Sequence, residues 1–217
     1  MFKPPDNLAN QYVYAPLMGT GPFTEQHHAL LRGSWDFVRH GSMGLAALRV
    51  RDEAIAGDMA EVGVWRGDCA MFIHLFAPER TFYLFDTFEG FPDQKEEDDN
   101  RFKGEFLDTS EELVRQKFKD MPSVILKKGI FPNTTIGLEN NRYCLVSLDC
   151  DLYQPILDGW RYFYPRMSPG GYIFLHDHNG LGYNAGPARA TQEFLADKPE
   201  KIVDLPDQWG SIMIRKF

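Results

Sequence analysis

Acidic side chains follow several apolar runs of this sequence at the points where those runs end. Asp149 and Asp151 come directly after the run that closes at Leu148, and His176 and Asp177 follow a later run. In an open α/β sheet, ligands bind outside the carboxyl ends of the strands, so acids at these ends would share one rim. The acids that this pattern predicts at the rim are Glu61, Asp86, Asp149, Asp151 and Asp177.

Two carboxylates placed two residues apart are costly to bury unless they have a partner. Asp149 and Asp151 therefore indicate a metal ion or a role in proton transfer, and His176 adds an imidazole that titrates near neutrality. Two alternatives stay open. Asp151 could cap the helix expected after it, and His176 could only hydrogen-bond a neighbouring acid and keep it ionised.

A second candidate ligand site is the stretch from Gly57 to Gly67, which reads as a buried strand over 59–64 and a tight turn, followed by a helix to about residue 77. Gly63 and Gly67 let backbone N–H groups approach a ligand, because they carry no Cβ. Glu61 lies just before the turn, where its carboxylate can accept hydrogen bonds from an ammonium group. We expect a small cationic ligand here, with an ordinary tight turn as the alternative.

A dinucleotide suits this turn less well. Its pyrophosphate needs a G-x-G-x-x-G turn, whose middle glycine position is held here by Trp65. The bulk of Trp65 would keep a pyrophosphate away, whereas a cofactor without phosphate tolerates it.

Apolar runs and helical spacings then alternate along the chain, as in an α/β protein with a doubly wound sheet. Strands are predicted over 81–86, 123–128, 142–148 and after a turn at 168–171, and helices over 109–119, from about 155 to 166 and from Pro187. Thr109 begins the capping box expected for the first of these helices. Residues 201–216 read as two strands with a turn near 206–210, an antiparallel pair at the far edge.

The ends of the second and third predicted strands could hold a nucleoside. Asp86 lies where an acid can bind two ribose hydroxyls, or else it only begins the turn that follows. Gly129, Ile130 and Phe131 lie where an adenine ring could stack, although Phe131 could equally belong to the core.

Residues 1–57 contain little strand signal and two stretches with helical spacing, 24–40 and 43–56. We interpret 1–57 as an N-terminal helical cap on a domain that spans 58–217. The apolar character of these helices is consistent with a homodimer.

Composition argues against several classes of protein. The chain has 217 residues, a formal net charge of −8 and a pI near 5.2, and it lacks a basic stripe, so no nucleic-acid partner is expected. No run of about 18 apolar residues and no leader are visible, so we expect a cytoplasmic protein without a membrane partner. Three scattered cysteines predict core residues, not disulfides or a zinc site: Cys69, Cys144 and Cys150.

Together these motifs resemble the class I S-adenosylmethionine-dependent methyltransferases, and specifically the macrocin O-methyltransferase family, which methylates hydroxyls on antibiotic sugars. The resemblance is carried by AEVGVWRGDCA, YLFDTFEGFP, KKGIF, SLDCDLY, YPRMSPGGYIFLHD and QWGSIMIRK, in the family's order over residues 58–217. It implies a Rossmann-like methyltransferase fold, with a seven-stranded, mostly parallel sheet whose last strand is antiparallel. Here that fold would carry an N-terminal helical extension.

The resemblance also implies S-adenosylmethionine as the cofactor, with Glu61, Gly63 and Gly67 around its methionine part and Asp86 on its ribose. The cofactor-binding residues expected on this basis are Glu61, Gly63, Trp65, Gly67, Asp86, Thr87, Gly129, Ile130, Phe131 and Asp149.

A magnesium ion is implied at Asp149 and at an acid pair on the fifth strand, with Asp151 as general base, but that pair reads His176-Asp177 in this chain. Magnesium prefers oxygen ligands, so the histidine weakens the case for this ion. Two mechanisms stay open. A divalent metal on Asp149, Asp177 and His176 could lower the pKa of the substrate hydroxyl while Asp151 takes the proton, or His176 or Asp151 alone could act as the base.

The sequence thus predicts a methyltransferase that acts on a hydroxyl of a sugar or another polyhydroxylated small molecule, with Asp151, His176 and Asp149 as catalytic residues. The alternative is a metal-dependent hydrolase with the cluster Asp149, Asp151, His176, Asp177 and His178. A third class, a cofactor-binding protein without turnover, is disfavoured because both Asp149 and Asp151 are intact.

Acceptor specificity is expected in the N-terminal helices and in the loops 94–108 and 180–186. Trp65, Tyr153 and Tyr183 are aromatic residues near the predicted rim that could stack on a sugar or an aromatic ring, or could serve only in packing.

Overall fold

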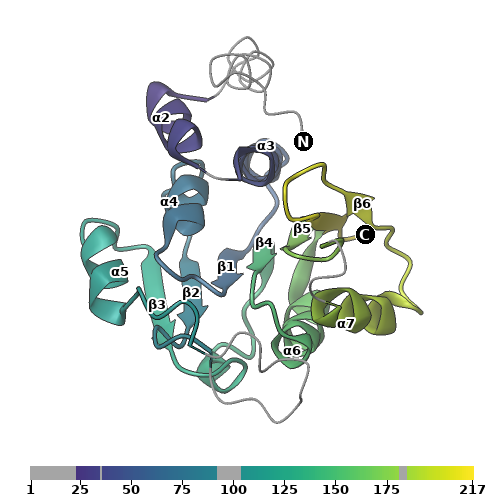
Figure 1. The fold of residues 1–217 in the computed structure, drawn as a ribbon. Helices are drawn as coiled ribbons and strands as arrows, with labels where there is room; N and C mark the ends of the chain where they lie inside the picture. The colour runs from purple at the N-terminus through teal and green to yellow at the C-terminus, as the bar shows by residue number, and fades with distance from the viewer. Residues whose placement is uncertain (1–22, 35, 92–103, 181–184) are drawn as a thin grey trace, which may run out of the picture.

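The computed structural model describes residues 23–34, 36–91, 104–180 and 185–217 and shows a central sheet with helices on both faces (Figure 1). The sheet has seven strands in the order β3-β2-β1-β4-β5-β7-β6. Their bounds are β1 Asp58–Val62, β2 Phe82–Asp86, β3 Val124–Lys128, β4 Tyr143–Leu148, β5 Met167–Leu175, β6 Val203–Asp204 and β7 Ile212–Arg215.

Strands β1 to β5 are parallel, whereas β7 runs antiparallel to both β5 and β6. The sequences of the central strands account for this arrangement. All six residues of β4 are buried, as expected for a strand covered on both faces of a parallel sheet. The predicted seven-stranded, mostly parallel sheet with an antiparallel pair at its far edge is confirmed.

Helices cover both faces, so the sheet is doubly wound as predicted. One face carries α2 (Glu25–Gly33), α3 (Phe37–Asp52), α4 (Asp68–His74) and α5 (Glu111–Lys117), and the other carries α6 (Tyr153–Phe163) and α7 (Gly186–Leu195) (Figure 1). Each face has its own apolar core. Phe72 and Met43 belong to the first core, and Trp160 and Phe163 to the second.

The strand order reverses between β1 and β4. From β1 the chain moves outward through β2 and β3, and it then returns to the other side of β1 as β4. Ligands of doubly wound sheets bind at the carboxyl ends of the strands beside such a reversal. The Asp149 N–H donates to the carbonyl of Val62 at 2.8 Å and so joins the two strand ends at this point.

Helix α3 runs across the sheet in the direction opposite to the parallel strands. Glu53, at its C-terminal end, pairs with Arg215 at the end of β7, whereas Arg39 in its first turn reaches Asp149 at the end of β4. The helix also packs against α4, β4 and β5. Its first turn therefore lies at the carboxyl ends of the strands. The predicted division of the chain after residue 57 stays a prediction.

The predicted bounds of the N-terminal helices were wrong. Instead of 24–40 and 43–56, α2 ends at Gly33 and α3 begins at Phe37. Ser34 has an extended backbone that closes α2, and the Asp36 side chain accepts a hydrogen bond from the Arg39 N–H, which starts a new helix. Apolar spacing alone could not reveal this break, because it continues through both helices.

The stretch 168–171 was predicted as a turn but lies inside β5. Gly170 has a φ of +87°, and the pairing of β5 with β4 shifts register between Tyr143 and Leu145, so this segment is an irregularity within the strand. Ser110, not Thr109, caps α5 by accepting a hydrogen bond from the Leu113 N–H at 3.1 Å.

The predicted ends of three other helices moved as well. α4 ends at His74 rather than near residue 77, α5 covers Glu111–Lys117, and α6 begins at Tyr153 and ends at Phe163 before a short 3₁₀ turn at Tyr164–Arg166. Hydrogen bonds at helix ends, not the spacing of apolar residues, set these bounds.

The three cysteines are free and buried, as predicted: Cys69, Cys144 and Cys150. Within the part of the chain that the structure describes, no helix combines the length and the apolar character needed to cross a membrane.

A Gly63→Ala substitution tests the close approach of the β1 turn to β4. An added Cβ would lie 1.7 Å from the Asp149 carbonyl oxygen, and Gly63 has a φ of +84°. A left-handed backbone alone costs an L-residue about 1–2 kcal/mol, so we expect the free energy of unfolding in urea to fall by more than about 2 kcal/mol.

Gly33→Ala is the matched control, because nothing lies within 4 Å of a Cβ added there. It should change the free energy of unfolding by less than about 1 kcal/mol. A Gly63→Ala protein as stable as the wild type would contradict the observed contact between the two strand ends.

Candidate functional site

The predicted acids gather at one edge of the sheet because the parallel hydrogen-bond ladder continues past the strand ends. The Asp149 N–H donates to Val62, and the His176 N–H donates to Leu148 at 3.0 Å. Asp86 ends β2, the neighbour of β1 on its other side. Acidic residues of four strands therefore lie at the same edge, beside the reversal of strand order.

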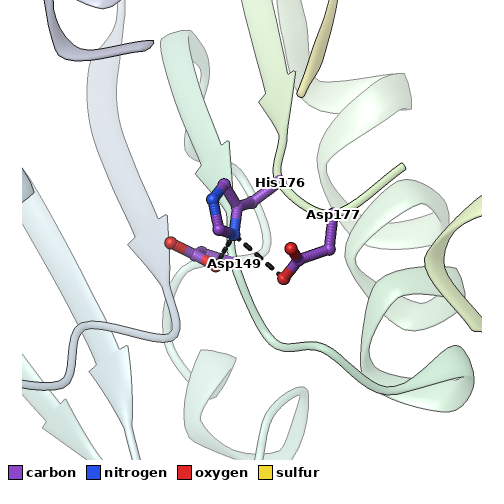
Figure 2. A group of neighbouring side chains, drawn as sticks. All are labelled: Asp149, His176 and Asp177. Atoms are coloured by element: carbon purple, nitrogen blue, oxygen red, sulfur yellow. Dashed lines mark hydrogen bonds and ion pairs between the residues drawn. The ribbon is translucent and has the colours of Figure 1, made fainter. Parts of the chain in front are cut away.

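His176 lies between two carboxylates at the ends of β4 and β5 (Figure 2). Its Nδ1 is 2.9 Å from Asp149 Oδ1 and 2.9 Å from Asp177 Oδ2. Both neighbours are acceptors, so Nδ1 carries a proton and donates it. Burial opposes the charged imidazolium, but the carboxylate of Asp149 outweighs burial and raises the pKa of His176 well above its usual value.

An arginine from helix α3 completes this cluster. Arg39 Nη1 donates to Asp149 Oδ2 at 2.6 Å, and Arg39 Nε lies 2.8 Å from Asp36 Oδ2. The side chains of Arg39 and Asp36 are only 9% and 7% exposed. Burial would raise the pKa of Asp149, but His176 and Arg39 together hold it well below its usual value. Asp36 also faces the second ring nitrogen of His176, Nε2, at 3.5 Å.

Neither Arg39 nor Asp36 was predicted to belong to the site. The only signal in the sequence is a pair of opposite charges three residues apart in an otherwise apolar helical stretch, a spacing that is common on exposed helices.

Asp151 has an unusual backbone for its residue type. Its φ is +56°, and that of Asp177 is +58°. Such left-handed conformations cost roughly 1–3 kcal/mol and recur at functional sites. Burial and the charges of Asp149 and Asp177, together with a hydrogen bond with Asp177, raise the pKa of Asp151 well above its usual value. The alternative of Asp151 as a helix cap was wrong, because α6 has Leu152 at that position and no capping side chain.

Glu61 is a buried carboxylate that forms no salt bridge with the residues that the structure describes. It is 1% exposed, and neither of its oxygens has a hydrogen-bond partner among the residues that the structure describes. The neighbouring thiol of Cys69 points to the sulfur of Met43 at 3.6 Å. Burial raises the pKa of Glu61 to about 8. An unpaired carboxylate in such a place is costly, so the position favours a cationic ligand.

The carboxylate of Asp86 accepts hydrogen bonds from backbone N–H groups of two turns. Its Oδ2 accepts hydrogen bonds from the Val64 and Trp65 N–H groups at 2.6 and 2.8 Å, and its Oδ1 accepts one from Phe88 at 2.6 Å. The carboxylate thus ties the turn after β1 to the turn after β2, a link that was not predicted. Its role in holding a ribose stays a prediction.

The residues predicted to face an adenine ring follow β3. The Gly129 N–H donates to the Asp86 carbonyl at 2.9 Å, so this segment adjoins the end of β2. Ile130 is 53% exposed, whereas the side chain of Phe131 is buried in the core and stacks on Phe163. Only the backbone of Phe131 is therefore available to a ligand.

The remaining predicted cofactor residues lie in the turns after β1 and β2. Trp65 donates its indole N–H to Asp108 at 2.7 Å, which fastens it to the segment before α5. Gly67, with a φ of +74°, begins α4. Thr87 donates its hydroxyl to the Gly90 carbonyl at 2.6 Å.

Not all residues of the alternative hydrolase cluster converge. Among the described residues, the group whose candidate ligand atoms lie within 4.8 Å of one another is Asp149, His176 and Asp177. His178 is not part of it, and its Nδ1 lies 3.0 Å from the Asn179 side chain instead.

The aromatic residues predicted near the rim could stack on a ligand or serve in packing, and the structure describes only part of them. Tyr153 donates its hydroxyl to Glu193, and Tyr183 and most of the loops 94–108 and 180–186 lie outside the described residues. Trp209, which was not predicted, is 45% exposed, and its ring centroid lies 6.3 Å from that of His176.

A comparison with protein families agrees with this geometry. The family model described as macrocin-O-methyltransferase (TylF) matches residues 39–206. The chain belongs to this family. The matched stretch begins at Arg39 and includes the ends of β1 to β5, and the predicted family resemblance is confirmed.

Individual relatives of this macrocin-O-methyltransferase family member carry related names. The Streptomyces olivaceus 8-demethyl-8-(2,3-dimethoxy-alpha-L-rhamnosyl)-tetracenomycin-C 4'-O-methyltransferase is 29% identical over 174 residues, 69% of this chain and 66% of that protein. The Streptomyces niveus demethyldecarbamoylnovobiocin O-methyltransferase is 29% identical over 140 residues, 57% of this chain and 53% of that protein. The chain thus matches less than two thirds of the length of each.

The solved structure of the O-methyltransferase NovP superposes with a TM-score of 0.73 at 24% identity, covering 83% of this chain and 80% of that one. This similarity shows a shared fold and confirms the predicted fold class. The names of the relatives favour methyl transfer over the hydrolase alternative.

The residues of this family member do not fit a magnesium ion. Mg²⁺ prefers an octahedron of oxygen ligands, whereas the converging group offers two carboxylates and an imidazole. The Nδ1 of His176 donates a proton to both carboxylates, so it has no lone pair for a metal. The other oxygen of Asp149 is paired with Arg39.

Glu61→Gln should remove a pH dependence of stability. The pKa of Glu61 in the folded protein is about 8, above the ordinary 4.5, so its protonated form favours folding. This contribution is complete below about pH 4.5 and is lost as pH rises through about 8. Between these values we expect the free energy of unfolding of the wild type, relative to Glu61→Gln, to fall by up to about 1.4 kcal/mol per pH unit.

Urea denaturation without ligand at several pH values measures this slope. Glu79→Gln changes a side chain that is 65% exposed and should keep the wild-type slope. If the wild type and Glu61→Gln give parallel curves, Glu61 is not a buried, unpartnered acid.

Proposed function

We propose that this protein is an S-adenosylmethionine-dependent O-methyltransferase that acts on a hydroxyl of a sugar or another polyhydroxylated small molecule. The observation that carries the proposal is the unpartnered, buried carboxylate of Glu61 at the end of β1. The cofactor's ammonium group is the kind of cation that such a carboxylate lacks. Membership of the macrocin-O-methyltransferase family supports the reaction class.

The turns after the first three strands would hold this cofactor. Glu61, Gly63 and Gly67 would surround its methionine part, and the missing Cβ of Gly63 keeps the backbone of Asp149 close to the β1 turn. The remaining predicted contacts are Trp65, Asp86, Thr87, Gly129, Ile130 and the backbone of Phe131. When bound, S-adenosylmethionine supplies an electrophilic methyl group on a sulfonium.

We assign the general base to Asp151. His176 donates from Nδ1 to two carboxylates, so that nitrogen has no lone pair to accept a proton. Burial and neighbouring acids raise the pKa of Asp151, which makes its ionised carboxylate a stronger base than an exposed one. Asp149 and His176 would act beside it by fixing the positions of the strand ends.

The acceptor is proposed from the relatives. The Streptomyces olivaceus enzyme is named for a rhamnosyl group and the Streptomyces niveus enzyme for a novobiocin derivative, so a glycosylated small molecule is the first class to test. The half-exposed ring of Trp209 beside His176 would give such a sugar an apolar surface. The homodimer, the cytoplasmic location and the absence of nucleic-acid and membrane partners stay predictions.

Binding of S-adenosylhomocysteine should release protons. A cation paired with Glu61 lowers its pKa, and at neutral pH the carboxyl starts mostly protonated because its pKa is about 8. Calorimetry near pH 7 in buffers of different ionisation enthalpy should therefore report release of about one proton per ligand bound. Glu61→Gln should release none and bind roughly 10 to 100 times more weakly.

No heat of binding by the wild type would overturn the proposed function. Binding without proton release would leave the cofactor class in place but contradict the assignment of Glu61 to the ammonium group.

Asp151→Asn should separate catalysis from cofactor binding. Incubation with S-adenosylmethionine and a panel of rhamnosides and nucleotide sugars, followed by mass spectrometry, identifies an acceptor by the gain of one methylene. With that acceptor, loss of the base should lower kcat by roughly 10²–10⁴-fold. The affinity for S-adenosylhomocysteine should stay near that of the wild type. An Asp151→Asn enzyme with unchanged kcat would exclude Asp151 as the base.

A further inference from the structure

Arg39 bridges two carboxylates from different layers of the molecule. Asp36 precedes α3 on one face of the sheet, and Asp149 follows β4 in the sheet itself. The guanidinium meets Asp36 Oδ2 with Nε at 2.8 Å and Asp149 Oδ2 with Nη1 at 2.6 Å. Its planar fork suits two acceptors at once, and all three side chains are largely buried.

Each of the two cationic side chains in this cluster lies next to at least two carboxylates. Arg39 contacts Asp36 and Asp149, and His176 contacts Asp149 and Asp177 with Nδ1 and faces Asp36 with Nε2. His40, in the same turn of α3, adds no charge near neutrality, because burial and Arg39 lower its pKa to about 4. A divalent cation placed among these acids would meet two cationic groups at close range.

We propose that Arg39 is the resident cation of this site, holding Asp149 in place of a divalent metal ion, and that Asp149, His176 and Asp177 bind no such ion. Three of the four carboxylate oxygens of Asp149 and Asp177 are already paired with a cationic side chain. Asp149 Oδ2 pairs with Arg39, and Asp149 Oδ1 and Asp177 Oδ2 both pair with His176. The charge stabilisation that a metal gives is supplied by the chain itself.

This inference rests on the proposed function for its catalytic meaning, since Asp149 and Asp151 are the groups that Arg39 would position. Arg39 is a positioning residue: it acts on the acceptor side of the site through Asp149. The N-terminal helix α3 is then a part of the active site, not only a cap over it, because it provides the guanidinium that the end of β4 requires.

Titration with Mn²⁺, followed by electron paramagnetic resonance on the full chain in complex with S-adenosylhomocysteine, tests the proposal. The wild type should bind no Mn²⁺ at concentrations up to about 1 mM, the weak end of protein sites. Arg39→Met removes the cation but keeps an apolar stem, and His176→Asp replaces the imidazole with a third carboxylate. Both variants should gain Mn²⁺ binding with a Kd of about 1 mM or tighter.

Two further variants make the result specific. Arg39→Lys retains a positive charge and should stay without Mn²⁺, which a merely structural role of Arg39 would not predict. Arg49→Met removes an arginine of the same helix that is 61% exposed and should match the wild type. Should Arg39→Met fail to fold by circular dichroism, His176→Asp still tests the site.

Binding of Mn²⁺ by the wild type with a Kd below about 1 mM would overturn the proposal. So would folded Arg39→Met and His176→Asp proteins that bind no more Mn²⁺ than the wild type. The same Mn²⁺ titration is repeated on the ligand-free protein, and calorimetry with S-adenosylhomocysteine is run on the same samples. A failure to bind S-adenosylhomocysteine would count against the proposed function, whereas the Mn²⁺ result of the ligand-free protein would still test this inference.

Discussion

The ion pair between Arg39 and Asp149 joins the N-terminal helices to the edge of the sheet that carries the candidate site. A buried carboxylate at the end of β4 needs a positive partner, and removal of one member of such a pair leaves an uncompensated charge. Helix α3 can supply the partner only because it packs against α4, β4 and β5 with its first turn at the carboxyl ends of the strands. The packing of α3 on that face of the sheet therefore also determines whether the charge of Asp149 is balanced.

The turns at the edge that carries the site share an unusual backbone conformation. A residue other than glycine adopts a positive φ after each of four strands: Trp65, Phe88, Asp151 and Asp177. The turns that contain them are tied to one another by the hydrogen bonds of Asp86 and by the continued strand ladder. Such fixed turns keep the side chains of the site in place before a ligand arrives.

Much of the fold and part of the site could be predicted from the sequence. Buried parallel strands such as β4 are near-continuous apolar runs, and the acids after them must lie at one edge, which placed Glu61, Asp86 and Asp149 together. Helix ends could not be predicted from apolar runs, since capping by Asp36 or Ser110 depends on single side chains. Arg39 was missed because it lies 110 residues from Asp149, and no local pattern reports that contact.

The crystal structure of the complex with S-adenosylhomocysteine, grown in the presence of Mn²⁺, tests the central claim most directly through its anomalous difference density. We expect no anomalous peak between Asp149, His176 and Asp177, and the Arg39 guanidinium hydrogen-bonded to Asp149. An anomalous peak within bonding distance of these two carboxylates, with Arg39 turned away, would contradict the account.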